Sequence, residues 1–141
     1  MPYRDFHLSY KKTALACDEI LLSIAISRNT SGYKAYIRKV GTRNAQAISK
    51  VAIAAVADIS NGRIEDIRIG SASLRETPAR LVATEQSLLN RPITPETIAG
   101  ARAAVLTEIV PIDDIRSTAK YRAAVAANLI EEFLLTLRHS Q

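Results

Sequence analysis

The sequence predicts an α+β fold in which an antiparallel, or mixed, sheet of about four strands precedes three helices packed on one face. Two observations support this fold class. Alternating apolar residues and an Asn-Gly turn mark the first half of the chain, whereas three helix-start signals mark the second half. The 141 residues contain no internal repeat and no recognisable linker, so we expect residues 1–141 to form a single domain.

The first two predicted strands lie before residue 41. In Glu19–Ile26, Ile or Leu occupies every second position from Ile20 onward, which gives the segment one fully apolar face. A polar turn at Asn29–Gly32 leads to the second predicted strand, Tyr33–Val40, in which charged and apolar residues alternate. The residues that follow, up to Ser49, are polar and predict an irregular loop.

The third and fourth predicted strands form a hairpin. Val51–Ile59 is apolar on both faces, as in a central strand, although its alanines also permit a helix. Asn61-Gly62 favours the strand, because both residues accept the positive φ of a tight hairpin turn. The partner strand is Arg63–Leu74, in which Ile64 is out of phase with the later isoleucines. We therefore expect a bulge near Glu65-Asp66.

The second half of the chain predicts helices. Thr77-Pro78 resembles a helix start, Leu81, Glu85 and Leu88 recur at helical spacing, and Arg91-Pro92 ends this first helix.

Thr94-Pro95-Glu96 begins the second predicted helix, which Pro111 ends, and Ser117 begins the third. The expected buried stripe of the second helix is Ile98, Ala101, Val105 and Ile109. The expected stripe of the third helix is Tyr121, Val125, Leu129, Phe133 and Leu137.

The composition argues against several classes of function. The net charge is +5, but the basic residues are spread along the chain, and the densest group, Arg38, Lys39 and Arg43, is small. Nucleic-acid binding is therefore not expected. The single cysteine, Cys17, excludes an intramolecular disulfide. No apolar stretch reaches membrane-spanning length and no signal-peptide core is present, so we expect a cytoplasmic location without membrane contact.

Residue chemistry alone predicts no catalytic residue and no metal site. His7 and His139 lie near opposite ends of the chain, without Cys or His neighbours at ligand spacing. No nucleophile elbow or glycine-rich phosphate loop is present. Asp113-Asp114 has two interpretations: half of a metal site, or acidic residues placed at the positive end of the third helix. The second interpretation is the simpler one.

Three segments resemble the C-terminal domain of the FAD-binding subunit of molybdenum hydroxylases, the xanthine dehydrogenase and carbon monoxide dehydrogenase flavoprotein family. The first is FHLSYKKTALACDEILLSIAI, and the second is RKVGTRNAQAISKVAIAA, Arg38 to Ala55. The third is PIDDIRSTAKYRAAVAANLI. Residues 1–18 resemble the segment by which the chain leaves the flavin domain in this family. Lys120 departs from the family pattern, which has an acid before the Tyr-Arg pair. The matching residues in the first and third segments are Tyr10, Lys11, Lys12, Thr13, Leu15, Glu19, Ile20, Asp114, Arg116, Thr118, Tyr121 and Arg122.

The resemblance implies a role in electron transfer within a larger oxidoreductase. In the family, FAD passes electrons from iron–sulfur clusters and a molybdenum centre on other subunits to an acceptor, and most FAD contacts come from an upstream FAD-binding domain. The residue that matches a family flavin contact is Lys50, while Lys39 and Arg43 flank the same loop. The resemblance implies FAD in the complete subunit, and no cofactor and no turnover in the isolated chain.

Two other interpretations remain open. The chain could be a stand-alone protein-interaction module that keeps the fold without flavin, and then its basic loop and an exposed strand edge would bind the partner. The net charge alone suggests a third interpretation, a small nucleic-acid-binding protein. A homodimer is compatible with each interpretation.

Overall fold

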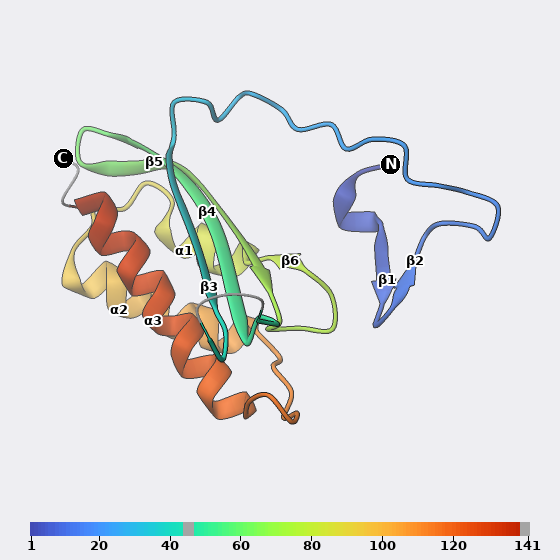
Figure 1. The fold of residues 1–141 in the computed structure, drawn as a ribbon. Helices are drawn as coiled ribbons and strands as arrows, with labels where there is room; N and C mark the ends of the chain where they lie inside the picture. Colours follow the sequence, from blue (N-terminus) through green and yellow to red (C-terminus); the bar gives the residue numbers. More distant parts are fainter. Residues whose placement is uncertain (44–46, 139–141) are drawn as a thin grey trace.

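A four-stranded antiparallel sheet, with three helices on one face, forms the body of the molecule (Figure 1). The computed structural model describes residues 1–43 and 47–138. The sheet order is β3-β4-β5-β6, comprising Lys34–Val40, Val51–Ser60, Arg63–Ala72 and Ala79–Arg80. The helices are α1, α2 and α3, comprising Val82–Leu88, Pro95–Glu108 and Ala119–Arg138. The predicted α+β fold class is confirmed.

The β4–β5 hairpin forms as its turn residues predict. Asn61 and Gly62 have φ values of 50° and 71°, which are the left-handed values that a tight hairpin turn requires. Asp58 pairs with Asp66 and Ile59 pairs with Ile64, so Glu65 has no opposite residue. The expected bulge is therefore confirmed, and it brings Ile64 onto the buried face with Ile67.

The prediction of a first strand at Glu19–Ile26 is wrong. Residues 19–26 lie outside every strand of the described chain, and Ile20 and Leu22 are 83% and 89% exposed. This segment belongs to an arm that also carries the 3-10 turn Tyr3–Asp5 and the short strands β1, His7–Ser9, and β2, Lys12–Thr13 (Figure 1). Alternating apolar residues indicate an extended backbone, but they do not show that another strand pairs with it.

The fourth strand of the sheet is β6, a segment that the sequence assigned to a helix. Ala79 pairs with Ser71 and Arg80 pairs with Gly70, so the Thr77-Pro78 signal leads into an edge strand instead. Helix α1 begins only at Val82. The predicted helical spacing is nevertheless confirmed, because all three residues of the expected stripe are buried: Leu81, Glu85 and Leu88.

Helix α2 forms as predicted. The side chain of Thr94 accepts a hydrogen bond from the amide of Thr97, and Pro95 occupies the first turn. The predicted buried stripe, from Ile98 to Ile109, is confirmed. The helix ends at Glu108, and Pro111 lies beyond it.

Helix α3 begins at Ala119, two residues after the predicted start, and buries a face rotated from the predicted stripe. Leu129, Phe133 and Leu137 are buried as expected, but Tyr121 is 43% exposed and Val125 is only half-buried. The buried positions that the stripe omitted are Arg122, Ala126, Ala127, Ile130 and Leu134. A helix that packs both on a sheet and on a neighbouring helix needs a wider apolar face than a single stripe provides.

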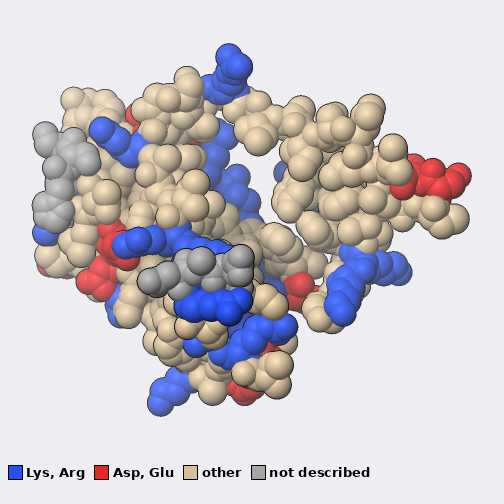
Figure 2. Space-filling view, viewed as in Figure 1, with Lys and Arg blue, Asp and Glu red and all other residues tan. Residues whose placement is uncertain are grey.

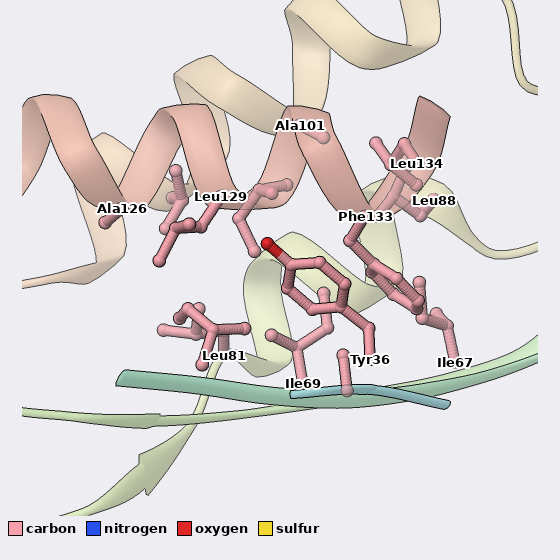
Figure 3. Packing of buried hydrophobic residues seen from close by; sticks show 14 of the residues in the cluster. Tyr36, Ile67, Ile69, Leu81, Leu88, Ala101, Ala126, Leu129, Phe133 and Leu134 are labelled. Carbon is pink, nitrogen blue, oxygen red and sulfur yellow. The ribbon is translucent and has the colours of Figure 1, made fainter. Parts of the chain in front are cut away.

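The core lies between the sheet and the helices. Tyr36 of β3 points toward α3, where its ring lies 5.3 Å from that of Phe133 (Figure 3). Each buried aliphatic or aromatic side chain of this kind contributes roughly 1.5–3 kcal/mol. The other face of the sheet is open: Ile37 is 80% exposed, and Ala54 is exposed beside it. No helix of the described residues combines the length and the apolarity that crossing a membrane requires.

The buried carboxylate of Glu85 links α1 to strands β5 and β6. Glu85 is 7% exposed, and its Oε1 accepts hydrogen bonds from the amide of Ile69 at 2.7 Å and from Nε of Arg80 at 2.6 Å. A second bond runs from Nη2 of Arg80 to the other carboxylate oxygen. The side chain of Glu85 thus satisfies a strand amide that a two-residue edge strand leaves without a backbone acceptor.

We predict that Glu85→Ala lowers the free energy of unfolding by about 2–4 kcal/mol, because the buried amide of Ile69 loses its acceptor and Arg80 loses its partner. Urea unfolding followed by circular dichroism measures this change. The matched control is Glu131→Ala, which removes the more exposed ion pair with Arg102 and should cost less than about 1 kcal/mol. Equal losses in the two variants would contradict the prediction.

Candidate functional site

A groove of about 690 Å³ lies at one end of the sheet. The loop before β4, the loop between β5 and β6, the connection between α2 and α3, the first turn of α3 and Tyr10 of the N-terminal segment all contribute to it. Its walls are partly apolar, with Ile48 and Ile112 among the lining residues. Its polar groups include the ion pair between buried Arg122 and half-buried Asp114.

Arg122 is the polar residue around which these segments converge. It is 3% exposed, and its Nη1 donates to the carbonyl of Lys50 at 2.6 Å and to the carbonyl of Ser73 at 3.1 Å. Nη2 donates to Oδ1 of Asp114 at 2.7 Å. Nε has no hydrogen-bond partner within residues 1–43 and 47–138. The planar guanidinium thereby binds the start of β4, the residue just after β5, and the loop before α3.

Asp114 provides the compensating charge. Its Oδ1 also accepts hydrogen bonds from the amides of Arg116 at 2.9 Å and Ser117 at 3.0 Å. Although partial burial by itself raises the pKa of Asp114, these two amides and the guanidinium of Arg122 outweigh that effect and lower the pKa to about 2. Asp114 is therefore a carboxylate throughout the physiological range.

The helix-start interpretation of the acidic pair is confirmed. Oδ1 of Asp113 accepts a hydrogen bond at 2.6 Å from the amide of Ala119, the first residue of α3. Across the described residues, no three His, Cys, Asp or Glu side chains gather as a metal-binding group. Nε2 of His7 lies in the arm, 3.1 Å from the hydroxyl of Tyr3. His139 lies outside the described residues.

Lys50 lies at the edge of the groove, as the first residue before β4. Its amide donates to the carbonyl of Val40 at 2.7 Å, and its carbonyl accepts the bond from Arg122. Its ammonium nitrogen lies 5.1 Å from the centre of the Tyr121 ring, a cation–π contact. Tyr121, which we expected to pack within the core, instead holds this lysine at the surface.

The two weaker candidates, Lys39 and Arg43, lie before and within the loop that leads to Lys50. Lys39 is exposed, and its register opposite Ala52 places it with Ile37 on the open face of the sheet. Arg43 is exposed in the loop that leads to Lys50. In the space-filling view, Lys and Arg side chains gather over the lower ends of β3 and β4 (Figure 2). A flavin role for Lys39 and Arg43 remains a prediction.

The flavin contact assigned to Lys50 from the sequence stays a prediction, and sequence reasoning missed Arg122 as a buried residue. The spacing of Arg122 from Ala126, Leu129 and Phe133 places it on the buried face of α3, and this signal was present in the sequence. A charged residue on such a face needs a partner, and Asp114 lies eight positions earlier.

The low pKa of Asp114 predicts how stability depends on pH. Because the pKa in the folded chain, about 2, lies below the ordinary value of 3.8, ionised Asp114 stabilises the fold above about pH 4. This contribution is lost as the pH falls from 3.8 through about 2. We therefore expect Asp114→Asn to reduce stability at neutral pH and to flatten the decline in acid. Urea midpoints measured from about pH 6 to about pH 2 test this expectation, and parallel profiles for both proteins would contradict it.

The chain is similar to a known protein family in sequence and in fold. Residues 35–137, which include nearly all of β3 to β6 and of the three helices, match the model of the CO dehydrogenase flavoprotein C-terminal domain. The xanthine dehydrogenase FAD-binding subunit of Escherichia coli O157:H7 is 26% identical over 123 residues, which cover 86% of this chain and 42% of that protein.

Solved structures show the same fold. The carbon monoxide dehydrogenase of Hydrogenophaga pseudoflava matches with a TM-score of 0.78 and 25% identity over 91% of this chain and 44% of that chain. The reconstituted enzyme of Oligotropha carboxidovorans matches with a TM-score of 0.84 and 22% identity, covering 92% of this chain and 45% of that one. The chain thus spans less than half the length of these relatives. Because the family model matches well over half of the chain, residues 35–137, the chain belongs to the CO dehydrogenase flavoprotein C-terminal domain family.

Proposed function

We propose that this chain serves as the C-terminal domain of the FAD-binding subunit of a molybdenum hydroxylase. In that role it completes one wall of the flavin pocket and holds contacts with other subunits, and it does not turn over substrate alone. The observation that carries the proposal is the family match, which spans residues 35–137 and includes Lys50 at the edge of the groove. The FAD-binding subunit of Escherichia coli supports the assignment of the cofactor.

The chemistry around Lys50 fits an anionic group such as a reduced flavin. Its ammonium contacts the Tyr121 ring, and within the described chain no carboxylate forms an ion pair with it. The positive charge therefore remains available to a ligand. When bound, FAD supplies the electron-accepting ring, and Lys50 would hydrogen-bond a ring carbonyl or balance negative charge on it. Lys39 and Arg43 would add a more distant positive field.

The arm supports an upstream FAD-binding domain as a partner. Its segment 20–26 carries Ile and Leu side chains that are all more than half exposed, which is unusual for a soluble surface. In Figure 1 this segment is part of the extended connection between the β1–β2 hairpin and β3, outside the four-stranded sheet. An extended apolar segment of this kind is stabilised when another sheet or apolar surface covers it. The molybdenum and iron–sulfur subunits are the further partners that we propose for the complete assembly.

The main alternative, a stand-alone interaction module, would bind a protein partner through the basic loop and the free edge of β3. In the described residues, the sheet order β3-β4-β5-β6 leaves one edge of β3 without a neighbouring strand. Such a module would have no flavin role for Lys50. The two proposals therefore differ in what the lysine does.

We predict that the isolated chain is colourless and binds FAD no better than weakly, because the pyrophosphate-binding loops of the family belong to the upstream domain. Absorbance between about 350 and 500 nm, followed by titration with FAD, measures this binding directly. A yellow preparation with stoichiometric flavin would contradict the prediction. In that event, the chain would carry a flavin site of its own.

We predict that Lys50→Ala, introduced into a complete flavin subunit, lowers the flavin reduction potential or weakens FAD retention. A charge-assisted contact is worth roughly 1.5–3 kcal/mol, which corresponds to about a tenfold to hundredfold loss of affinity if it acts in binding. Redox titration and flavin content per subunit are the two measurements.

The matched control for this experiment is Lys34→Ala, at the opposite end of β3, where an exposed lysine is removed without approaching the groove. We expect wild-type flavin content and potential from it. If Lys50→Ala also retains both values, Lys50 is an ordinary surface lysine and the module interpretation gains support.

A further inference from the structure

We propose that Arg122 is the positioning residue for Lys50, and that the first turn of α3 fixes where the lysine ammonium is presented. The guanidinium of Arg122 holds the backbone of Lys50, while the adjacent ring of Tyr121 holds its side-chain nitrogen. The proposal depends on the proposed function only where a flavin is taken to contact the Lys50 ammonium. The positioning itself is a property of the chain and can be tested without any cofactor.

The backbone of Lys50 is anchored on both sides. Its amide donates to Val40 at 2.7 Å, and its carbonyl accepts from Nη1 of Arg122 at 2.6 Å. The first of these bonds belongs to the sheet, whereas the second comes from a helix 72 residues later in the chain. Arg122 therefore fixes Lys50 at the point where the irregular loop ends and β4 begins.

The side chain of Lys50 is anchored by the same helix. Tyr121 and Arg122 are consecutive residues of α3, so their side chains project about 100° apart around the helix axis. Arg122 points into the protein and is buried, while Tyr121 remains 43% exposed and lies under the ammonium group at 5.1 Å. Since both anchors belong to one rigid turn, a displacement of that turn moves the backbone and the ammonium of Lys50 together.

The groups that hold Arg122 explain why an arginine occupies this position. Its guanidinium serves two carbonyls and one carboxylate in a single plane, which a lysine ammonium cannot reproduce. One of those carbonyls belongs to Ser73, whose φ of 65° is uncommon for a residue other than glycine. Asp114 neutralises the guanidinium and is itself held by the amides of Arg116 and Ser117. The position of Lys50 thus depends on the whole cluster.

Nuclear magnetic resonance of the isolated chain tests this proposal. In the folded protein, the ring current of Tyr121 should displace the ε-methylene protons of Lys50 upfield from their position in the urea-unfolded chain. We expect Arg122→Lys to abolish this displacement, while the methyl signals of Ile53 and Ile130 in the core remain dispersed. Tyr121→Leu should also abolish it, which assigns the displacement to the ring. Arg102→Lys, on α2, should leave it unchanged.

The outcome that would overturn the proposal is an unchanged Lys50 signal in a folded Arg122→Lys variant. If that variant does not fold, the double variant Arg122→Met with Asp114→Asn is measured instead, with the displacement of the Lys50 ε-methylene protons as the same readout. Removing both members of a buried ion pair avoids an unpaired charge and is tolerated better than removing one. A retained displacement in the double variant overturns the proposal, and its loss with core signals intact supports it.

A second measurement separates positioning from the proposed flavin contact. In a complete flavin subunit, Arg122→Lys should shift the reduction potential in the same direction as Lys50→Ala, and combining the two should add nothing further. A lost ring-current displacement together with unchanged potentials in both variants would support the positioning role and overturn the flavin contact. The two hypotheses therefore fail on different observations.

Discussion

The guanidinium of Arg122 is buried where two strand ends, the loop before α3 and α3 itself meet, and this end of the molecule depends on it. A buried charge is costly unless it is paired and hydrogen-bonded. Here the carbonyls of Lys50 and Ser73 and the carboxylate of Asp114 supply that compensation. Each partner comes from a different segment, so the end of the sheet is well formed only when all of them are in place.

This cluster connects the fold to the proposed function. The helices cover one face of the sheet, leaving the other face and the ends of the strands accessible (Figure 1). Lys50 is half-buried at this end of the sheet and lies outside the core cluster. The fold is shared at low sequence identity, with a TM-score of 0.84 at 22% identity for the Oligotropha carboxidovorans enzyme. Many different side chains can fill such a core, provided that volume and pattern are kept.

The candidate site was only partly predictable. Lys50 could be placed at the rim because a polar loop ends and an apolar strand begins there, and its flavin role rested on the family resemblance. The exposure of Tyr121 could not be foreseen, because helical spacing alone admits several adjacent faces as the buried one. Arg122 was overlooked as a buried residue because long charged side chains are usually exposed, although its helical spacing and Asp114 eight positions earlier were visible in the sequence. Lys39 and Arg43 remain predictions.

Local interactions are what the sequence by itself determined. The Asn61-Gly62 turn, the bulge at Glu65 and the Thr94 cap each depend on residues only a few positions apart, so their chemistry could be read directly. Tertiary structure alone decided that residues 19–26 pair with no described strand and that β6 extends the sheet where a helix was expected. Strand pairing and helix orientation depend on distant surfaces, whose positions follow from the burial of the whole core rather than from local pattern.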